Sequence, residues 1–373
     1  MIKHSPSNDF EPNWAVPPGV TISAILSSRA VSRESFAEAV GESVESVQRL
    51  LLGLRSVDEH LADRLARCLG PSSAFWLARE AQYRADFQRI QSTCVEIACE
   101  VWVKQFPVRE MVKLGWIDDF QSTSEAAGEC FKLFGVPDVA AWNVKYAGAS
   151  AAAAFRMSAS ARANPGAITA WLRWAELIAE LTPCADWDPE LFKENLQAVR
   201  SLTWQKDPAT FLPKLRKLCA EAGVSVVVAR TPKGCPASGA TRFLSPNKAL
   251  MVLSFRYRSD DQFWFTFFHE AAHLLLHSGD AIFLEDESEV TSDEEGEANE
   301  FAAEVLIPRN YLSELLNLPL RRDPILRFAR RIGVSPGIVV GQLQHYKRIS
   351  LSHMNWLKRR YDWNQISMDK ITL

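Results

Sequence analysis

The sequence predicts a mostly α-helical protein of the α+β class, with a small β-sheet confined to its C-terminal part. Short amphipathic segments that end at glycines fill the first 70 residues, and a tryptophan-bearing helical pattern follows. Two short apolar runs typical of strands then precede a long apolar helix. We therefore expect a helical bundle over residues 1–90, a helical middle region over 91–205, and a mixed region over 206–373.

The composition is that of a folded chain without a general affinity for nucleic acid or membrane. Hydrophobic residues make up 47% of the 373 residues, charged residues 23%, and the net charge is −3, so any DNA contact must come from a local patch. No apolar run reaches the roughly 18 residues that span a bilayer, and the N-terminus has no apolar signal segment. We expect a cytoplasmic protein. The seven cysteines are odd in number and form no CxxC pair, which disfavours a disulfide framework.

The N-terminal region predicts two short helices joined by a tight turn. The first follows the candidate N-cap Ser32 and stops at Gly41, and the second follows Ser43 and stops at Gly53. This is the geometry of a helix-turn-helix, whose second helix presents its first residues to the major groove of DNA. Most helix pairs with this pattern only pack in a bundle.

Several side chains near the second helix are candidates for DNA contact. They are Arg33, Ser43, Glu45, Ser46, Arg49 and Arg55. Glu42 and Glu45 lie among them with few cations, and carboxylates repel phosphates. We therefore keep two interpretations open, a weak DNA-binding module and a protein-docking module.

Residues 18–84 resemble the Xre/HigA-type helix-turn-helix, through "FAEAVGESVESVQRLLLG" and "ADRLARCLGPSSAFWLAREAQYR". The resemblance implies operator DNA as a partner and a possible homodimer. In the middle region, an amphipathic helix that carries Trp171 and Trp174 follows a turn at Pro165. No chemical motif occurs there, and we expect it to serve as core and connector.

The stretch "HEAAHLLLH", residues 269–277, lies in a strongly apolar helix. His269 and His273 are four residues apart and share one helix face, so both imidazoles can reach one tetrahedral cation. Glu270 points about 100° away and can approach a water at the metal without being a ligand. The pattern predicts a catalytic zinc site. The competing interpretation is a pair of structural histidines that are hydrogen-bonded within a core.

A catalytic zinc ion needs a third protein ligand, and the candidates are carboxylates. The segment 292–308 predicts a second amphipathic helix, whose buried stripe brings Glu294 and Glu295 inward and leaves Glu297 further round. Asn299 lies one turn after Glu295 and is a candidate hydrogen-bond partner for a ligand. For His277, one turn beyond His273, we expect a structural role at the helix end or support of a ligand from behind.

"HEAAHLLLH" followed by "EGEANEFAAEVLIP" resembles the ImmA/IrrE family of zinc metallo-endopeptidases, with similarity over about residues 210–345. The resemblance implies a gluzincin-like domain in which Glu295 is the third zinc ligand. His345 and Tyr346 are the kind of residues that gluzincins use to stabilise the oxyanion, and they are candidates for that role here. The resemblance also implies a specific protein substrate, often a helix-turn-helix repressor cut in response to stress or prophage induction.

Two functions follow from these patterns. The first is a zinc-dependent endopeptidase in which Glu270 takes the proton from the attacking water and passes it to the leaving amine. The second is a non-proteolytic antitoxin or transcriptional regulator that binds operator DNA and a cognate toxin. The complete H-E-x-x-H pattern favours the first.

Overall fold

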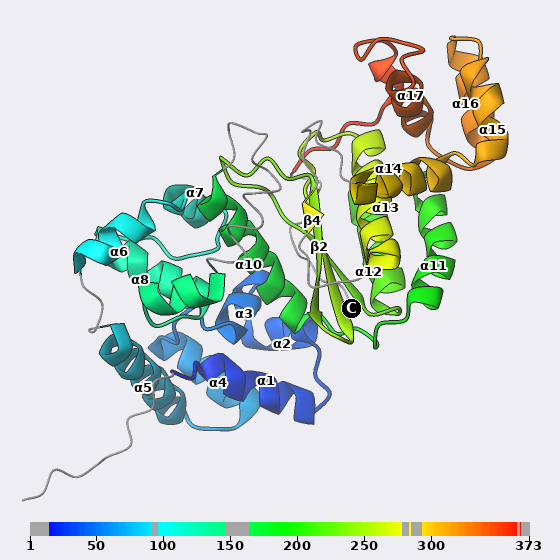
Figure 1. The fold of residues 1–373 in the computed structure, drawn as a ribbon. Helices are drawn as coiled ribbons and strands as arrows, with labels where there is room; N and C mark the ends of the chain where they lie inside the picture. The colour runs from blue at the N-terminus through cyan, green and yellow to red at the C-terminus, as the bar shows by residue number, and fades with distance from the viewer. Residues whose placement is uncertain are drawn as a thin grey trace, which may run out of the picture. The chain divides into compact units, whose positions relative to one another are not determined.

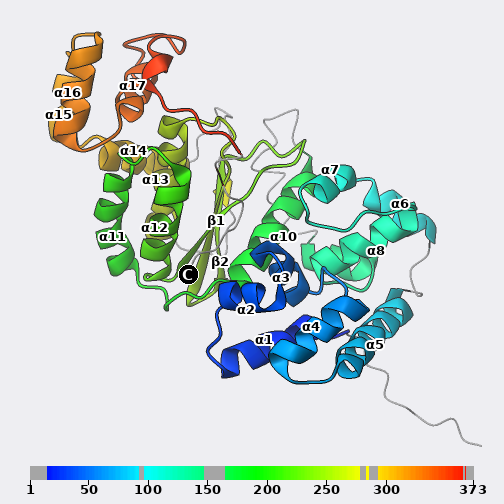
Figure 2. The same ribbon diagram turned by 180° about the vertical axis from the view of Figure 1, so that it is seen from behind.

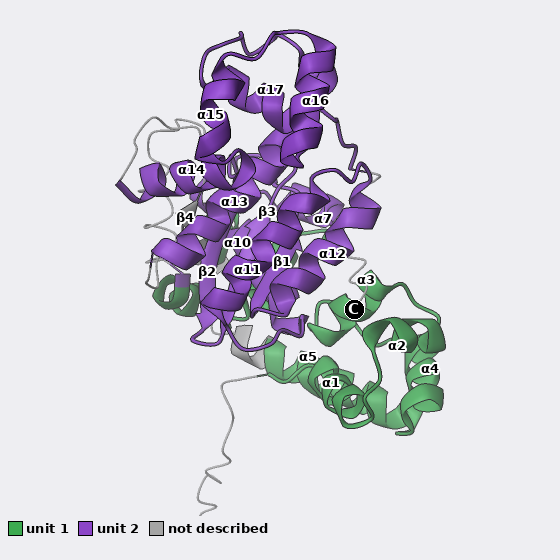
Figure 3. Cartoon of the chain, turned by 90° about the vertical axis from the view of Figure 1, so that its right-hand side faces the viewer, with its two compact units in different colours: residues 1–104, 115–145 green, residues 105–114, 146–373 purple. Residues whose placement is uncertain are grey.

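The helices and strands of the chain fall into two units (Figure 3). The computed structural model describes residues 15–91, 96–146, 164–277, 283–284, 293–363 and 366. One unit comprises residues 1–104 with 115–145, and the other comprises residues 105–114 with 146–373. The middle region expected over 91–205 is divided between them, because α6 (Glu96–Val103) packs against α8 (Thr123–Phe134) in the first unit whereas α10 (Pro165–Leu181) packs on the sheet of the second.

The first unit is helical throughout the elements that the structure describes in it. These are α1 (Pro18–Ser28), α2 (Arg33–Val40), α3 (Val44–Leu51), α4 (Glu59–Leu69), α5 (Ser73–Gln91), α6 (Glu96–Val103) and α8 (Thr123–Phe134). The predicted helix starts are confirmed, since the Oγ atoms of Ser32 and Ser43 each accept a hydrogen bond from the backbone three residues on. Gly41 ends α2 in the left-handed conformation, with φ 69°.

The second unit contains a four-stranded mixed sheet, and its order is β1-β3-β2-β4. The strands are β1 (Val224–Val228), β2 (Gly239–Ser245), β3 (Lys248–Leu253) and β4 (Phe283–Leu284). β1 runs parallel to β3, whereas β2 is antiparallel to both of its neighbours. Every residue of β1 is buried, which explains its continuous run of apolar and small side chains. The small sheet that the sequence predicts in the C-terminal region is thus confirmed.

Helices cover both faces of this sheet. Figures 1 and 2 show α10 (Pro165–Leu181) on one face, and α12 (Pro208–Ala220) and α13 (Asp260–Leu276) on the other. Alternation along β2 matches this layering: Arg242 contacts Glu176 of α10, and the adjacent Thr241 contacts Glu270 of α13. Most apolar residues of α13 are therefore buried between the sheet and the helices around it.

The remaining helices of the second unit are α7 (Val108–Lys113), α11 (Pro189–Leu202), α14 (Asp293–Leu306), α15 (Arg309–Leu316), α16 (Arg322–Ile332), α17 (Pro336–His345) and a 3₁₀ turn (Asn355–Leu357). Of these, α11, α14 and α17 pack against α13. The first turn of α13 is anchored to the C-terminal segment: Asp260 accepts hydrogen bonds from the Ser335 hydroxyl at 2.7 Å and from the Arg359 amide at 3.0 Å. The position of α13 along its axis is fixed in this way.

Two further expectations concern membrane contact and cysteines. Among the helices that the structure describes, none has the length and apolar character to cross a bilayer. Among the residues that the structure describes, five cysteines hold free thiols, namely Cys68, Cys130, Cys184, Cys219 and Cys235. Cys99 is disulfide-bonded, which the cysteine spacing did not predict.

Candidate metal centre

Helix α13 carries the imidazole pair into the interior of the second unit. His269 and His273 are each 1% exposed, and Glu270 between them is fully buried. The helix forms because its apolar residues pack against β2, β3 and α17 over several turns, and α14 packs on its remaining side. Since buried polar groups need partners, the contacts of these three side chains define the site.

His269, His273 and Glu295 come together at one point between α13 and α14. The Nε2 atoms of the two histidines lie 3.0 Å apart. The carboxylate oxygens of Glu295 lie 3.2 Å from His269 Nε2 and 3.5 Å from His273 Nε2. One ligand atom from each residue lies within 4.8 Å of the others. Bonds of about 2.0–2.1 Å in a tetrahedron place donor atoms about 3.3 Å apart. The three groups therefore fit a small tetrahedral cation, with one coordination position left over.

The protonation of the group suits metal binding. Burial alone would raise the pKa of Glu295, but the contacts of its carboxylate with the two imidazoles hold this pKa at about 2, so the carboxylate is ionised. Burial lowers the pKa of His273, which the neighbouring Glu295 only partly offsets. A neutral imidazole and an ionised carboxylate are the forms that coordinate a metal.

The three carboxylates proposed from the sequence are placed differently. Glu295 faces the imidazole pair, as just described, whereas Glu294 is exposed. Glu297 is 3.1 Å from Nε2 of His277 instead. The Oδ1 atom of Asn299 lies 3.0 Å from Nδ1 of His269, so this side chain can orient the imidazole through a hydrogen bond to the nitrogen that faces away from Glu295.

Glu270 lies on the sheet side of α13. Its Oε2 atom accepts a hydrogen bond from the Thr241 hydroxyl of β2 at 3.0 Å, and Thr241 is 1% exposed. At Gly239, an added Cβ atom would lie 2.6 Å from Glu270 Oε1, so only glycine leaves room for the carboxylate. Sequence reasoning missed both β2 residues, and their only signal is a glycine and a hydroxyl at alternate positions of a strand.

His345 and Tyr346 lie at the end of α17. Together with Asn299 they line a cavity of about 450 Å³ in the second unit. This places them on the side of α14 where Asn299 lies. Their part in stabilising an oxyanion stays a prediction.

The candidate DNA contacts all lie in the first unit, and most are engaged there. Arg55 pairs with Glu42, Arg49 pairs with Asp118, and Arg33 is 8% exposed. The remaining candidates belong to the first turn of α3: Ser43 is its N-cap, the Ser46 hydroxyl donates to Glu42 at 2.8 Å, and Glu45 is exposed. DNA binding through these residues stays a prediction.

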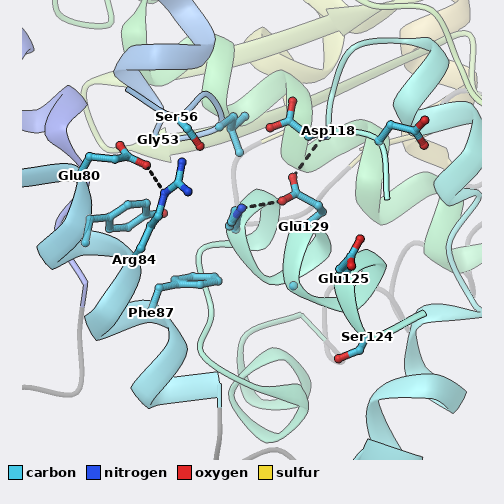
Figure 4. Close-up of a pocket in the computed structure, with 14 residues that line it drawn as sticks. Gly53, Ser56, Glu80, Arg84, Phe87, Asp118, Ser124, Glu125 and Glu129 are labelled. Carbon is cyan, nitrogen blue, oxygen red and sulfur yellow. Dashed lines mark hydrogen bonds and ion pairs between the residues drawn. The ribbon is translucent and has the colours of Figure 1, made fainter. Parts of the chain in front are cut away.

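A pocket of about 410 Å³ within the first unit is lined by five carboxylates and two cations, Arg84 and Lys132, so its net charge is negative (Figure 4). The carboxylates are Glu80, Asp118, Asp119, Glu125 and Glu129. Arg84 is hydrogen-bonded to Glu80 at 2.8 Å and Lys132 to Glu129 at 2.5 Å. Such a surface repels phosphate groups. The pocket therefore offers no support for a nucleic-acid contact at this place.

Comparison with known proteins finds a family match for the region that contains His269, His273 and Glu295. Residues 220–343 match the peptidase M78 family model, which is described as the IrrE N-terminal-like domain. No curated protein matches the chain. The matched segment runs from the end of α12 to α17 and includes all three members of the group. This part of the chain is therefore similar to metallopeptidases of the IrrE type.

Proposed function

We propose that the protein is a zinc-dependent endopeptidase that cleaves a specific regulatory protein, such as a repressor. The observation that carries this proposal is the group of His269, His273 and Glu295, together with the buried Glu270 that follows His269 on α13. Two imidazoles and one carboxylate are a common ligand set of catalytic zinc. The similarity of residues 220–343 to peptidases supports the same conclusion.

The chemistry follows from the residues around the group. A bound zinc ion would act as a Lewis acid toward the water and the scissile carbonyl. Glu270 takes the proton of the attacking water and returns it to the leaving nitrogen. Thr241 donates to Oε2 of Glu270 and thereby holds the carboxylate in one orientation, while burial keeps competing water away. We assign the stabilisation of the tetrahedral oxyanion to His345 or Tyr346.

The role of the first unit is part of the same proposal. Residues 18–84 resemble a helix-turn-helix, and we propose that they bring the peptidase to its protein substrate or to operator DNA, in a cytoplasmic protein that can dimerise. The pairing of Arg49 and Arg55 with carboxylates leaves them less available to phosphates, which favours a protein partner.

The test compares the wild type with Glu270→Gln on a proteome-derived peptide library, with cleavage read by mass spectrometry. We expect zinc-loaded wild type to cut a restricted set of peptides, and Glu270→Gln to lose at least about 100-fold in rate. Glu194→Gln, a change on the exposed surface of α11 and outside the cavity that His345 and Tyr346 line, serves as the matched control and should cut normally. Equal cleavage by Glu270→Gln would refute the proposed base. Absence of zinc-dependent cleavage, together with toxin or operator binding, would support the non-proteolytic regulator.

A further inference from the structure

The third histidine of the motif lies beyond the end of the helix. Helix α13 ends at Leu276, and His277 is its C-cap with extended backbone angles, φ −114° and ψ 104°. Its amide donates to the carbonyl of His273 at 3.2 Å. This break from helical geometry brings the His277 ring back over His273, where the two Nδ1 atoms are 2.9 Å apart. His277 therefore meets the nitrogen of His273 that faces away from Glu295.

The proton positions along this contact can be deduced from the carboxylate at its far end. Glu297 Oε2 lies 3.1 Å from His277 Nε2, and an ionised carboxylate only accepts hydrogen bonds. His277 Nε2 therefore donates to Glu297. If His273 binds a cation through Nε2, its own Nδ1 carries a proton, so Nδ1 of His277 is the acceptor in the 2.9 Å contact. His273 must then donate from its own Nδ1. The lone pair of His273 is left on Nε2, the atom that faces His269 and Glu295.

We propose that Glu297 and His277 form a relay that fixes the tautomer and orientation of His273 as a metal ligand. The two imidazoles of the group are then supported differently: His269 donates to the neutral amide oxygen of Asn299, whereas His273 is backed by a carboxylate through a second imidazole. A partner of this kind raises the basicity of a ligating imidazole. The inference rests on the proposed metal site and adds two positioning residues to it.

The geometry distinguishes this role from direct coordination. A fourth ligand would have to face the Nε2 atoms of the pair, but the ring of His277 is in contact with the opposite nitrogen of His273. His277 is buried, with 8% exposure, while the Glu297 side chain is 63% exposed. Replacing Glu297 therefore removes the end of the relay without disturbing the core.

The test measures zinc affinity by competition with a chelator. His277→Phe keeps a ring but lacks an acceptor, and we expect it to weaken zinc binding about 10–100-fold. His277→Gln places an amide oxygen that can accept from His273 and should restore part of this loss. Glu297→Gln should weaken binding by a smaller factor, of about threefold or more. Glu194→Gln, an exposed change on α11, should bind as the wild type does.

A second measurement, ¹⁵N NMR of the histidines in the zinc-loaded protein, reports the tautomers directly. We expect His277 to carry its proton on Nε2 and His273 on Nδ1, and Glu297→Gln to weaken this preference. Wild-type zinc affinity in Glu297→Gln and His277→Gln, or the opposite tautomers, would overturn the relay. If His277→Phe does not fold, these two variants decide the question. A wild type that binds no zinc would overturn both the metal site and the relay, whereas zinc binding without peptide cleavage would overturn only the proposed function.

Discussion

Replacing Gly239 by alanine tests how closely β2 holds the proposed catalytic carboxylate. A Cβ atom at this position would lie 2.6 Å from Glu270 Oε1 and 2.7 Å from Thr266 Cγ2, both on α13. Real Cβ atoms essentially never approach closer than 3.0 Å, so the Glu270 carboxylate must move by at least the difference, about 0.4 Å. Because both contacts lie in the packed layer between sheet and helix, the strain also reaches the backbone.

The size of the effect follows from this displacement. A shift of about 1 Å in a catalytic group can cost about 100-fold in rate, so Gly239→Ala should lower kcat/KM about 10- to 100-fold, which corresponds to about 1.4–2.7 kcal/mol. Overpacking should also lower the free energy of unfolding by about 1–3 kcal/mol. Zinc content should stay unchanged, because Glu270 is not among the three proposed ligands. The assays are peptide cleavage, zinc stoichiometry and thermal unfolding.

Gly296 provides a matched control close to the same site. It lies within α14 next to Glu295, and a Cβ atom there would have no neighbour within 4 Å. Gly296→Ala should therefore leave cleavage intact and stabilise the helix by up to about 1 kcal/mol. If Gly239→Ala cleaves as fast as the wild type, the close packing of Glu270 against β2 is not important for catalysis, and the account of β2 given above is wrong.

Three further predictions concern charges within the fold. Burial raises the pKa of Asp260 from 3.8 to about 6, so as the pH falls the folded protein takes up this proton before the unfolded chain does. In urea titrations, the free energy of unfolding of the wild type, relative to that of Asp260→Asn, should therefore increase by up to about 3 kcal/mol between pH 7 and pH 4. Burial would raise the pKa of Glu42, but hydrogen bonds from Arg55 and Ser46 hold this pKa below its usual value of 4.5. The ionised Glu42 therefore adds to the free energy of unfolding above that pH, and this contribution should be lost in acid; Glu42→Gln should show a smaller decrease in thermal unfolding temperature between neutral and acidic pH. The Arg200 guanidinium donates to the carbonyls that end α14 and α16, and Arg200→Met should cost about 2–3 kcal/mol in chemical denaturation; a change below 0.5 kcal/mol would contradict the role of Arg200 in joining the two helices.

The local parts of the fold could be predicted from the sequence because their signals are local. Helix starts at Ser32 and Ser43 and the stop at Gly41 depend on side-chain and backbone preferences within a few residues. The spacing of His269 and His273 determines that both share one helix face, whatever surrounds them. These expectations agree with the structure for that reason.

The contacts that complete the site depend on parts of the chain that are distant in sequence. Periodicity left Glu294 and Glu295 as alternatives, because which of them meets the imidazoles depends on how α14 crosses α13. The hydrogen bond from Thr241 to Glu270 depends on the register of β2 against the helix, which no local pattern specifies. The break at His277 is a helix end without glycine or proline, so its signal is weak.

The central claim is that His269, His273 and Glu295 together bind one metal ion, and zinc stoichiometry tests it most directly. The wild type, purified and dialysed against a weak chelator, should retain about one zinc ion per chain by elemental analysis. Glu295→Ala and His273→Ala should each lose most of it, while Gly296→Ala retains it. Unchanged zinc content in Glu295→Ala would rule out this carboxylate as the third ligand, and a folded wild type without bound zinc would contradict the metal site itself.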